Sequence, residues 1–89
     1  MVVMILESVP PSVRGELTRW FLEPHAGVFV GKCSAVVRDR LWGVVRERLR
    51  GGGATLIHSA DTEQGYRIEF SGKNRRSVRD FEGLLLVSS

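Results

Sequence analysis

The sequence has few of the features that mark a secreted or membrane protein. Among 89 residues there is a single cysteine, Cys33, which excludes a disulfide framework or a cysteine-based zinc finger and fits a reducing cytosol. No apolar run approaches the ~20 residues that a membrane span needs. The apolar start, residues 1–6, has neither a cationic leader nor a small-residue cleavage pattern, so we expect no signal peptide. These absences predict a cytoplasmic protein.

Catalytic motifs are also scarce. His25 and His58 are far apart in the sequence, and neither neighbours the other parts of a nucleophilic site. A structural or surface role is favoured for His58 over that of a ligand or base. Cys33 borders a predicted helix N-terminus, but a packed small residue is favoured over a reactive thiol. Gly51, Gly52 and Gly53 follow a helix and precede no Gly-Lys-Ser/Thr, so they form no phosphate loop.

What the sequence does have is arginine. Thirteen basic side chains against ten acidic ones give a net charge of +3, and eleven of the thirteen are arginine. The planar guanidinium donates two hydrogen bonds at once to phosphate, which fits one focused basic surface. Arginine-rich chains also arise from GC-rich genomes or from helices with many salt bridges. Composition alone does not separate these interpretations.

Hydrophobic patterning predicts the first half of the fold. Residues 2–7, apolar up to Leu6 and ending at Glu7, indicate a strand buried on both faces. A helix is expected to follow it, starting near Pro11 and ending before Pro24 and Gly27. Residues 23–33 form either one strand or two short strands in a hairpin. Ser34 is the expected N-cap of a second helix. The apolar stripes of the two helices are Val13, Leu17, Trp20 and Phe21, and then Val37, Leu41, Val44, Val45 and Leu49.

The pattern in the second half of the sequence predicts strands. Residues 54–60 and 66–70 are expected strands around a turn at 61–65, and the alternation in the second places Tyr66, Ile68 and Phe70 on the core face. A short apolar strand, 84–87, ends the chain. The order predicts one α+β domain over residues 1–89, with a ferredoxin-like β-α-β-β-α-β plan, two helices on one face of an antiparallel sheet and an extra C-terminal strand. An exposed strand of this kind favours dimerisation by strand exchange.

Two features are candidates for function. Lys73, Asn74, Arg75 and Arg76 form a basic loop with no acid from Gly72 to Val78, which favours contacts to nucleic-acid phosphates. Glu7 ends the first strand, where it could bind a divalent metal together with its copy across a two-fold axis. A solvated acid, or a charge that favours the start of the next helix, is the plainer interpretation of Glu7.

Several stretches in order resemble a known family. They are Glu7-Ser8-Val9-Pro10-Pro11 with Arg14-Gly15, Ala26 to Gly31, the 61–65 turn, Asn74-Arg75-Arg76, and Gly83-Leu84 to Val87-Ser88. With these, the chain resembles the CRISPR-associated Cas-two family of adaptation proteins, in its type I-E branch, from end to end.

The resemblance implies a prokaryotic homodimer that bridges two dimers of the Cas-one integrase during spacer acquisition. Double-stranded DNA would lie across its basic face, held through phosphates by Arg14, Arg75 and Arg76. Lys73 lies in the same loop. The residues that would join the integrase are Leu84, Leu85, Leu86 and Val87.

The family has also been described as metal-dependent endonucleases with an aspartate at the end of the first strand. Here Leu6-Glu7-Ser8 stands at that place, so the aspartate is absent and Glu7 is the nearest carboxylate. Two hypotheses follow: a DNA-binding structural subunit, and a nuclease in which Glu7 is the catalytic and metal-binding residue and Mg²⁺ the cofactor. An unrelated ferredoxin-like regulator is a third.

Overall fold

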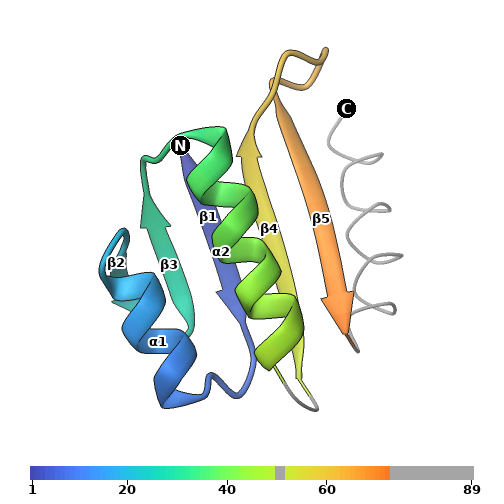
Figure 1. Ribbon diagram of the computed structural model, residues 1–89. Coiled ribbons are helices and arrows are strands. Elements are labelled where there is room, and N and C mark those ends of the chain that lie inside the picture. The colour runs from blue at the N-terminus through green and yellow to red at the C-terminus, as the bar shows by residue number, and fades with distance from the viewer. Residues whose placement is uncertain (50–51, 73–89) are drawn as a thin grey trace.

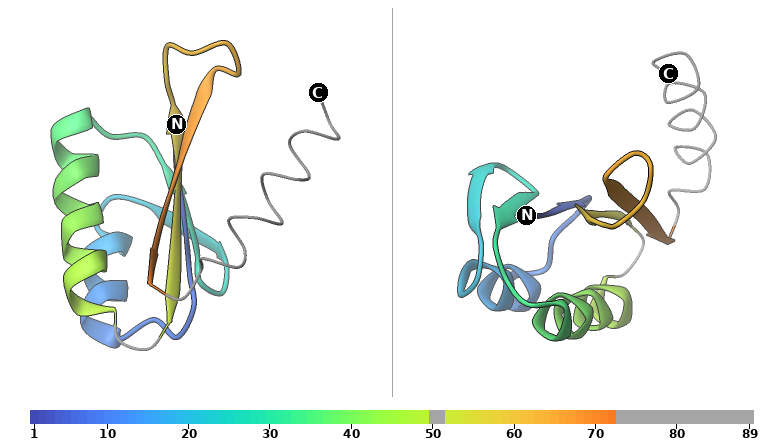
Figure 2. Two further views of the ribbon diagram at one scale, coloured as in Figure 1. Left: turned by 90° about the vertical axis from the view of Figure 1, so that its right-hand side faces the viewer. Right: turned by 90° about the horizontal axis from the view of Figure 1, so that it is seen from above.

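The computed structural model describes residues 1–49 and 52–72. Its elements in chain order are β1 (Val2–Leu6), α1 (Pro11–Thr18), β2 (Leu22–His25), β3 (Val28–Gly31), α2 (Ala35–Arg48), β4 (Gly53–Ser59) and β5 (Tyr66–Gly72). The strands form one antiparallel sheet in the order β2-β3-β1-β4-β5, and both helices cover the same face of it (Figures 1 and 2). This confirms the predicted α+β class, a ferredoxin-like core to which β5 adds a further strand.

The hydrophobic core lies between the helices and the three central strands. Every second residue of β1 points into it, so Val2, Met4 and Leu6 are buried. The largest side chains that are wholly enclosed are Phe29, Met4, Leu17, Leu56, Val13 and Val45. They come from both helices, β1, β3 and β4, and so fix the two layers against each other.

The first helix begins where predicted and ends early. Pro11 suits the first turn because its fixed φ is helical and a missing N–H costs nothing there. The helix stops at Thr18, since the chain must turn to enter β2 at Leu22. Trp20, which the predicted stripe placed on the core face, therefore lies beyond the helix and is 48% exposed, whereas Phe21 is buried as predicted. Neither helix in the described ranges is long and apolar enough to cross a membrane.

The second helix begins at its predicted cap. The Ser34 side chain accepts a hydrogen bond from the Val37 backbone N–H at 3.2 Å, which satisfies one N–H of the first turn. Leu41 and Val45 are buried as expected. Trp42 is buried as well, although the predicted stripe did not include it. Its large ring widens the apolar side of α2 toward the sheet.

The segment left open in the sequence, residues 23–33, folds as a hairpin of β2 and β3. Gly27 turns it with a φ of +80°, and a Cβ at Gly27 would lie 2.5 Å from the Leu6 carbonyl oxygen. The Leu6 N–H donates to the Gly27 carbonyl oxygen at 2.8 Å. The tip of the hairpin is thus fixed against the end of β1, and only glycine fits there.

The face of β5 that meets the core was predicted wrongly. In the register, Leu56 pairs with Glu69 and Ile57 pairs with Ile68. Because Leu56 faces the helices, Glu69 and Arg67 share that face, while Tyr66, Ile68 and Phe70 lie on the opposite one. Period-two alternation shows that a strand has an apolar side but not which side the helices cover.

This opposite face of the sheet is apolar across several strands. Val3 pairs with Val30 and Ile57, and Ile5 pairs with Val28. These side chains are partly buried to exposed, with Ile5 at 39%. We call the set the open face: Val3, Ile5, Val28, Val30, Ile57 and Ile68. Within the described ranges no helix or strand covers it (Figure 2).

Candidate nucleic-acid interface

Arg14, the phosphate contact implied by the resemblance, lies in α1 and is held by a carboxylate. Its Nε donates to both oxygens of Glu23 in β2, at 3.1 and 3.3 Å. The Arg14 side chain is 44% exposed, so the pair stands at the surface and adds little to stability. It does fix the direction of the guanidinium.

Glu23 is in turn fixed by the hairpin turn. Its Oε2 accepts the Gly27 backbone N–H at 2.9 Å, and its side chain is only 19% exposed. The hydrogen bonds from Gly27 to Glu23 and from Arg14 to Glu23 therefore link the turn beside β1 to the surface of α1. Both hydrogen bonds from Arg14 use Nε, which leaves the outer edge of the guanidinium, Nη1 and Nη2, oriented for a second anion.

Glu23 is a residue that the sequence did not single out. It lies nine positions from Arg14, which matches no spacing within a helix, so only the packing of β2 beside α1 brings the two together. The other predicted DNA contacts, Lys73, Arg75 and Arg76, lie outside the described residues. The same holds for Leu84, Leu85, Leu86 and Val87.

Glu7, the candidate metal ligand, directly follows β1 and is exposed. Its backbone N–H donates to the Gly53 carbonyl oxygen at 3.0 Å, and Ser8 after it has a φ of +53°. That conformation is uncommon for a residue other than glycine. Among the described residues no three His, Cys, Asp or Glu side chains gather as a metal site. Glu7 alone gives one carboxylate, which suits Mg²⁺ only with further oxygen ligands.

His58 has a structural environment, as expected. It is 7% exposed in β4, and its Nδ1 lies 3.2 Å from Arg38 Nη1 and 3.0 Å from the Ser59 carbonyl oxygen. Its Nε2 lies 3.7 Å from Glu69 on β5. These contacts connect α2, β4 and β5 and include no nucleophile.

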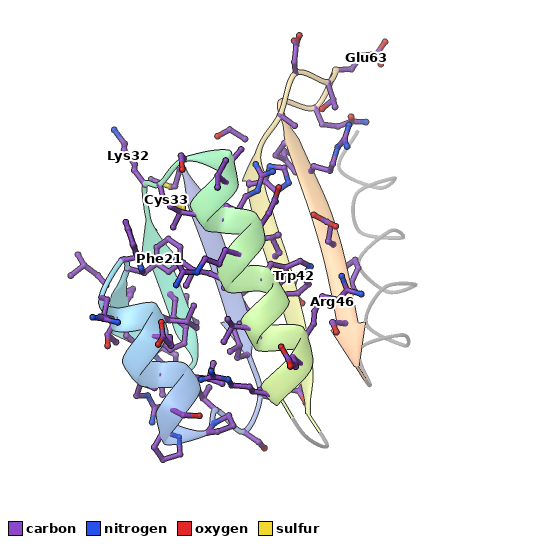
Figure 3. The ribbon with its side chains drawn as sticks, viewed as in Figure 1. Phe21, Lys32, Cys33, Trp42, Arg46 and Glu63 are labelled. Carbon is purple, nitrogen blue, oxygen red and sulfur yellow. The ribbon has the colours of Figure 1, made fainter. Side chains whose placement is uncertain are left out.

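Cys33 likewise behaves as a packing residue. It lies between β3 and α2 and contacts the core (Figure 3). Burial raises the pKa of its thiol above the ordinary 9.0, although Arg38 and the N-terminal amine oppose the shift. A thiol with a raised pKa is a poor nucleophile at neutral pH.

The arginines of α2 lie in two kinds of surroundings, a salt bridge and a groove. Arg38 is paired with its sequence neighbour Asp39 at 2.9 Å. Arg40 and Arg48 instead line a groove between α1 and α2, together with Arg19 and Trp20. This groove had no signal in the sequence, because its walls come from separate elements.

The comparison with protein families agrees with this architecture. The family model described as "CRISPR-associated protein (Cas_Cas2CT1978)" matches residues 1–86 of the chain. The matched range contains the positions of Glu7, Arg14, Glu23 and Gly27 and the predicted basic loop. It extends over nearly the whole sequence. The chain therefore belongs to the Cas2 family of CRISPR-associated proteins.

Proposed function

We propose that the protein is a structural subunit of CRISPR adaptation of type I-E, acting in the prokaryotic cytoplasm. It forms a homodimer that binds double-stranded DNA through phosphates and bridges dimers of the Cas-one integrase while a new spacer is acquired. The observation that carries this proposal is the family match over residues 1–86. The structure supports it, because the described residues offer an exposed arginine, Arg14, and an apolar open face on which a second copy could pack.

Arg14 and the basic loop supply the DNA contacts. Arg14 is exposed on α1 and pre-oriented by Glu23, so less side-chain entropy is lost when it binds a phosphate. Arg75 and Arg76, with Lys73 beside them, add positive charge in a segment without acids. Contacts of this kind position a duplex without reading its sequence.

The open face supports a homodimer. A second copy that packs its own open face against the first would bury Val3, Ile5 and Ile57 of both copies. Each of these side chains is β-branched and suits face-to-face packing of sheets. The helices of both protomers would then lie outward. We assign the joining of the integrase to Leu84, Leu85, Leu86 and Val87.

Binding to duplex DNA at several salt concentrations tests the proposal. Replacing Arg75 and Arg76 with alanine should lower the affinity and reduce the slope of log K against log salt by about one for each phosphate that the variant no longer binds. The matched control is Arg46→Ala with Arg48→Ala, which removes the same charge from α2. An unchanged slope would contradict phosphate binding by the loop, and an equal decrease in the control would show a general effect of the removed charge instead of contacts specific to the loop.

A magnesium-dependent endonuclease is the second candidate function. It is favoured by Glu7, an exposed acid directly after β1, and by the left-handed Ser8 beside it, since backbone strain gathers at functional sites. Two copies of Glu7 across a dimer axis would hold the ion, which would activate water. Purified protein should then cleave RNA or DNA with Mg²⁺, and Glu7→Ala should abolish cleavage. Cleavage that survives Glu7→Ala would come from another site or a contaminant.

A further inference from the structure

A groove between α1 and α2, on the outer side of the helix layer, has no role in the functions above. It has a volume of about 450 Å³, within the ~300–1,000 Å³ of typical ligand sites. Apolar side chains of α2 and the ring of Trp20 form part of its lining. The full lining is Glu16, Arg19, Trp20, Val37, Arg40, Leu41, Val44 and Arg48.

Trp20 is the notable member of this lining. An indole that is 48% exposed leaves a large apolar area in water, although Phe21, next to it, is buried. Tryptophan and arginine are the residues most enriched where proteins bind one another. Val36, one helical turn before Arg40, is also exposed and extends the apolar surface along α2.

The charge of the groove is positive. Arg19, Arg40 and Arg48 stand against the single acid Glu16, which contacts Arg19 at the long distance of 4.0 Å. An occupant must therefore offer both apolar side chains and negative charge. The phosphates of a duplex would meet the arginines but leave the partly exposed Val37 and Val44 unused. An acidic peptide meets both requirements.

We propose that the groove between α1 and α2 binds an acidic, amphipathic peptide segment of a partner protein. Apolar side chains of the segment pack on Trp20, Val37 and Val44. Its carboxylates pair with Arg40 and Arg48 on the rim. The groove lies on the helix side of the sheet, opposite the open face, so this binding does not use the surface proposed for the dimer.

The two tryptophans allow a direct test by NMR. Trp20 lies in the groove, whereas Trp42 is 5% exposed in the core, so their indole N–H signals report on different places. The probe is a synthetic peptide of about 14 residues, with leucines four positions apart and glutamates around them. On titration the Trp20 signal should shift with saturation and the Trp42 signal should change little.

Paired variants test the charge. Arg40→Glu with Arg48→Glu should weaken binding of the probe about tenfold or more, because two attractions become repulsions. Arg46→Glu is a control for reversal of charge on this helix, since Arg46 is on the same helix but on the side nearer β5, away from the groove (Figure 3). It should leave the affinity within about twofold. Retention of the Trp42 signal in each variant shows that the core is folded.

Three results would overturn the proposal. The first is a Trp20 signal that does not shift at millimolar probe. The second is an equal response to peptides whose glutamates are lysines or whose leucines are serines. The third is a Trp20 shift caused by duplex DNA that Arg40→Glu with Arg48→Glu removes, which would make the groove a DNA site. The proposed DNA-binding function is tested separately, by the duplex affinity of the variant Arg75→Ala with Arg76→Ala. Its failure would therefore not be mistaken for failure of the groove proposal.

Discussion

At the scale of single residues, Arg14 is best understood through the carboxylate that holds it. Glu23 fixes the direction of the Arg14 guanidinium while its own Oε2 accepts the Gly27 N–H, and in the proposed function this would aim Arg14 at a phosphate. The same carboxylate lowers the positive potential that a phosphate would meet. Orientation and attraction thus oppose each other at this position.

Substitutions at the pair separate these effects. Arg14→Ala should lower duplex affinity and reduce the salt slope by about one for each protomer that binds the duplex. Glu23→Gln should raise affinity, since a negative charge next to the phosphate is removed while an oxygen remains to accept from Arg14. Fluorescence anisotropy with a labelled duplex measures both. Arg19→Ala, also exposed near the end of α1, is the control and should leave the slope unchanged.

Cys33 gives a prediction about how the rate of thiol alkylation depends on pH. Because burial raises its thiol pKa, the folded state holds less thiolate than the unfolded chain at pH 8. Alkylation by iodoacetamide should be slower in native protein than in urea and should accelerate above pH 9. The stability that the protonated thiol contributes is present below the unfolded pKa and is lost as pH rises through the folded one. Native labelling that is faster than unfolded labelling at pH 7 would contradict this.

The local roles of single residues could be predicted from the sequence, but the contacts between distant residues could not. The N-cap role of Ser34 follows from the preference of serine for that position, and the Ser34 cap is present. The bond from Arg14 to Glu23, and that from Arg38 to His58, join segments that only the folded chain brings together. Local patterns hold no information about such contacts.

At the scale of elements, the turn between β2 and β3 depends on its glycine. Gly27→Ala would place a Cβ 2.5 Å from the Leu6 carbonyl oxygen at a positive φ. We expect a loss of about 2 kcal/mol or more in the free energy of unfolding, measured in urea. Gly15→Ala is the control. It lies inside α1 with open space around it, so it should gain up to about 1 kcal/mol. Equal effects of the two would contradict the assigned turn.

The order and type of the elements were predictable, because helical and alternating patterns have different periods. The assignment of β5 failed for a physical reason. The neighbouring strand β4 has apolar residues on both faces, such as Leu56 and Ile57, so alternation alone cannot choose between the helices and the open face.

The open face carries a prediction about assembly. Ile5→Asp would place a charge in the middle of β1 on the surface proposed to join two copies, without entering the core. Light scattering should show the mass falling from that of a dimer to the 9.9 kDa of one chain. Val36→Asp is the matched control, since it makes the same kind of change on α2, and its mass should stay that of the dimer. A dimer that persists in Ile5→Asp would place the interface elsewhere.

At the scale of the whole molecule, the two faces of the sheet differ in what covers them. The helices seal the core on one side, and the open face leaves apolar surface on the other (Figure 2). A dimer formed through that face would bring two sets of arginines around one axis. A net charge of +3 per chain is modest, but a proposed dimer that doubled it along one surface would give a duplex a longer basic path.

The central claim is that this chain bridges integrase dimers on DNA, and one measurement tests it most directly. The protein, the Cas-one integrase from the same organism and a short duplex are mixed, and the mass of the complex is determined by light scattering during size-exclusion chromatography. We predict one species with two copies of this chain, four of the integrase and one duplex. An integrase–duplex species whose mass is the same with and without this chain would contradict the account.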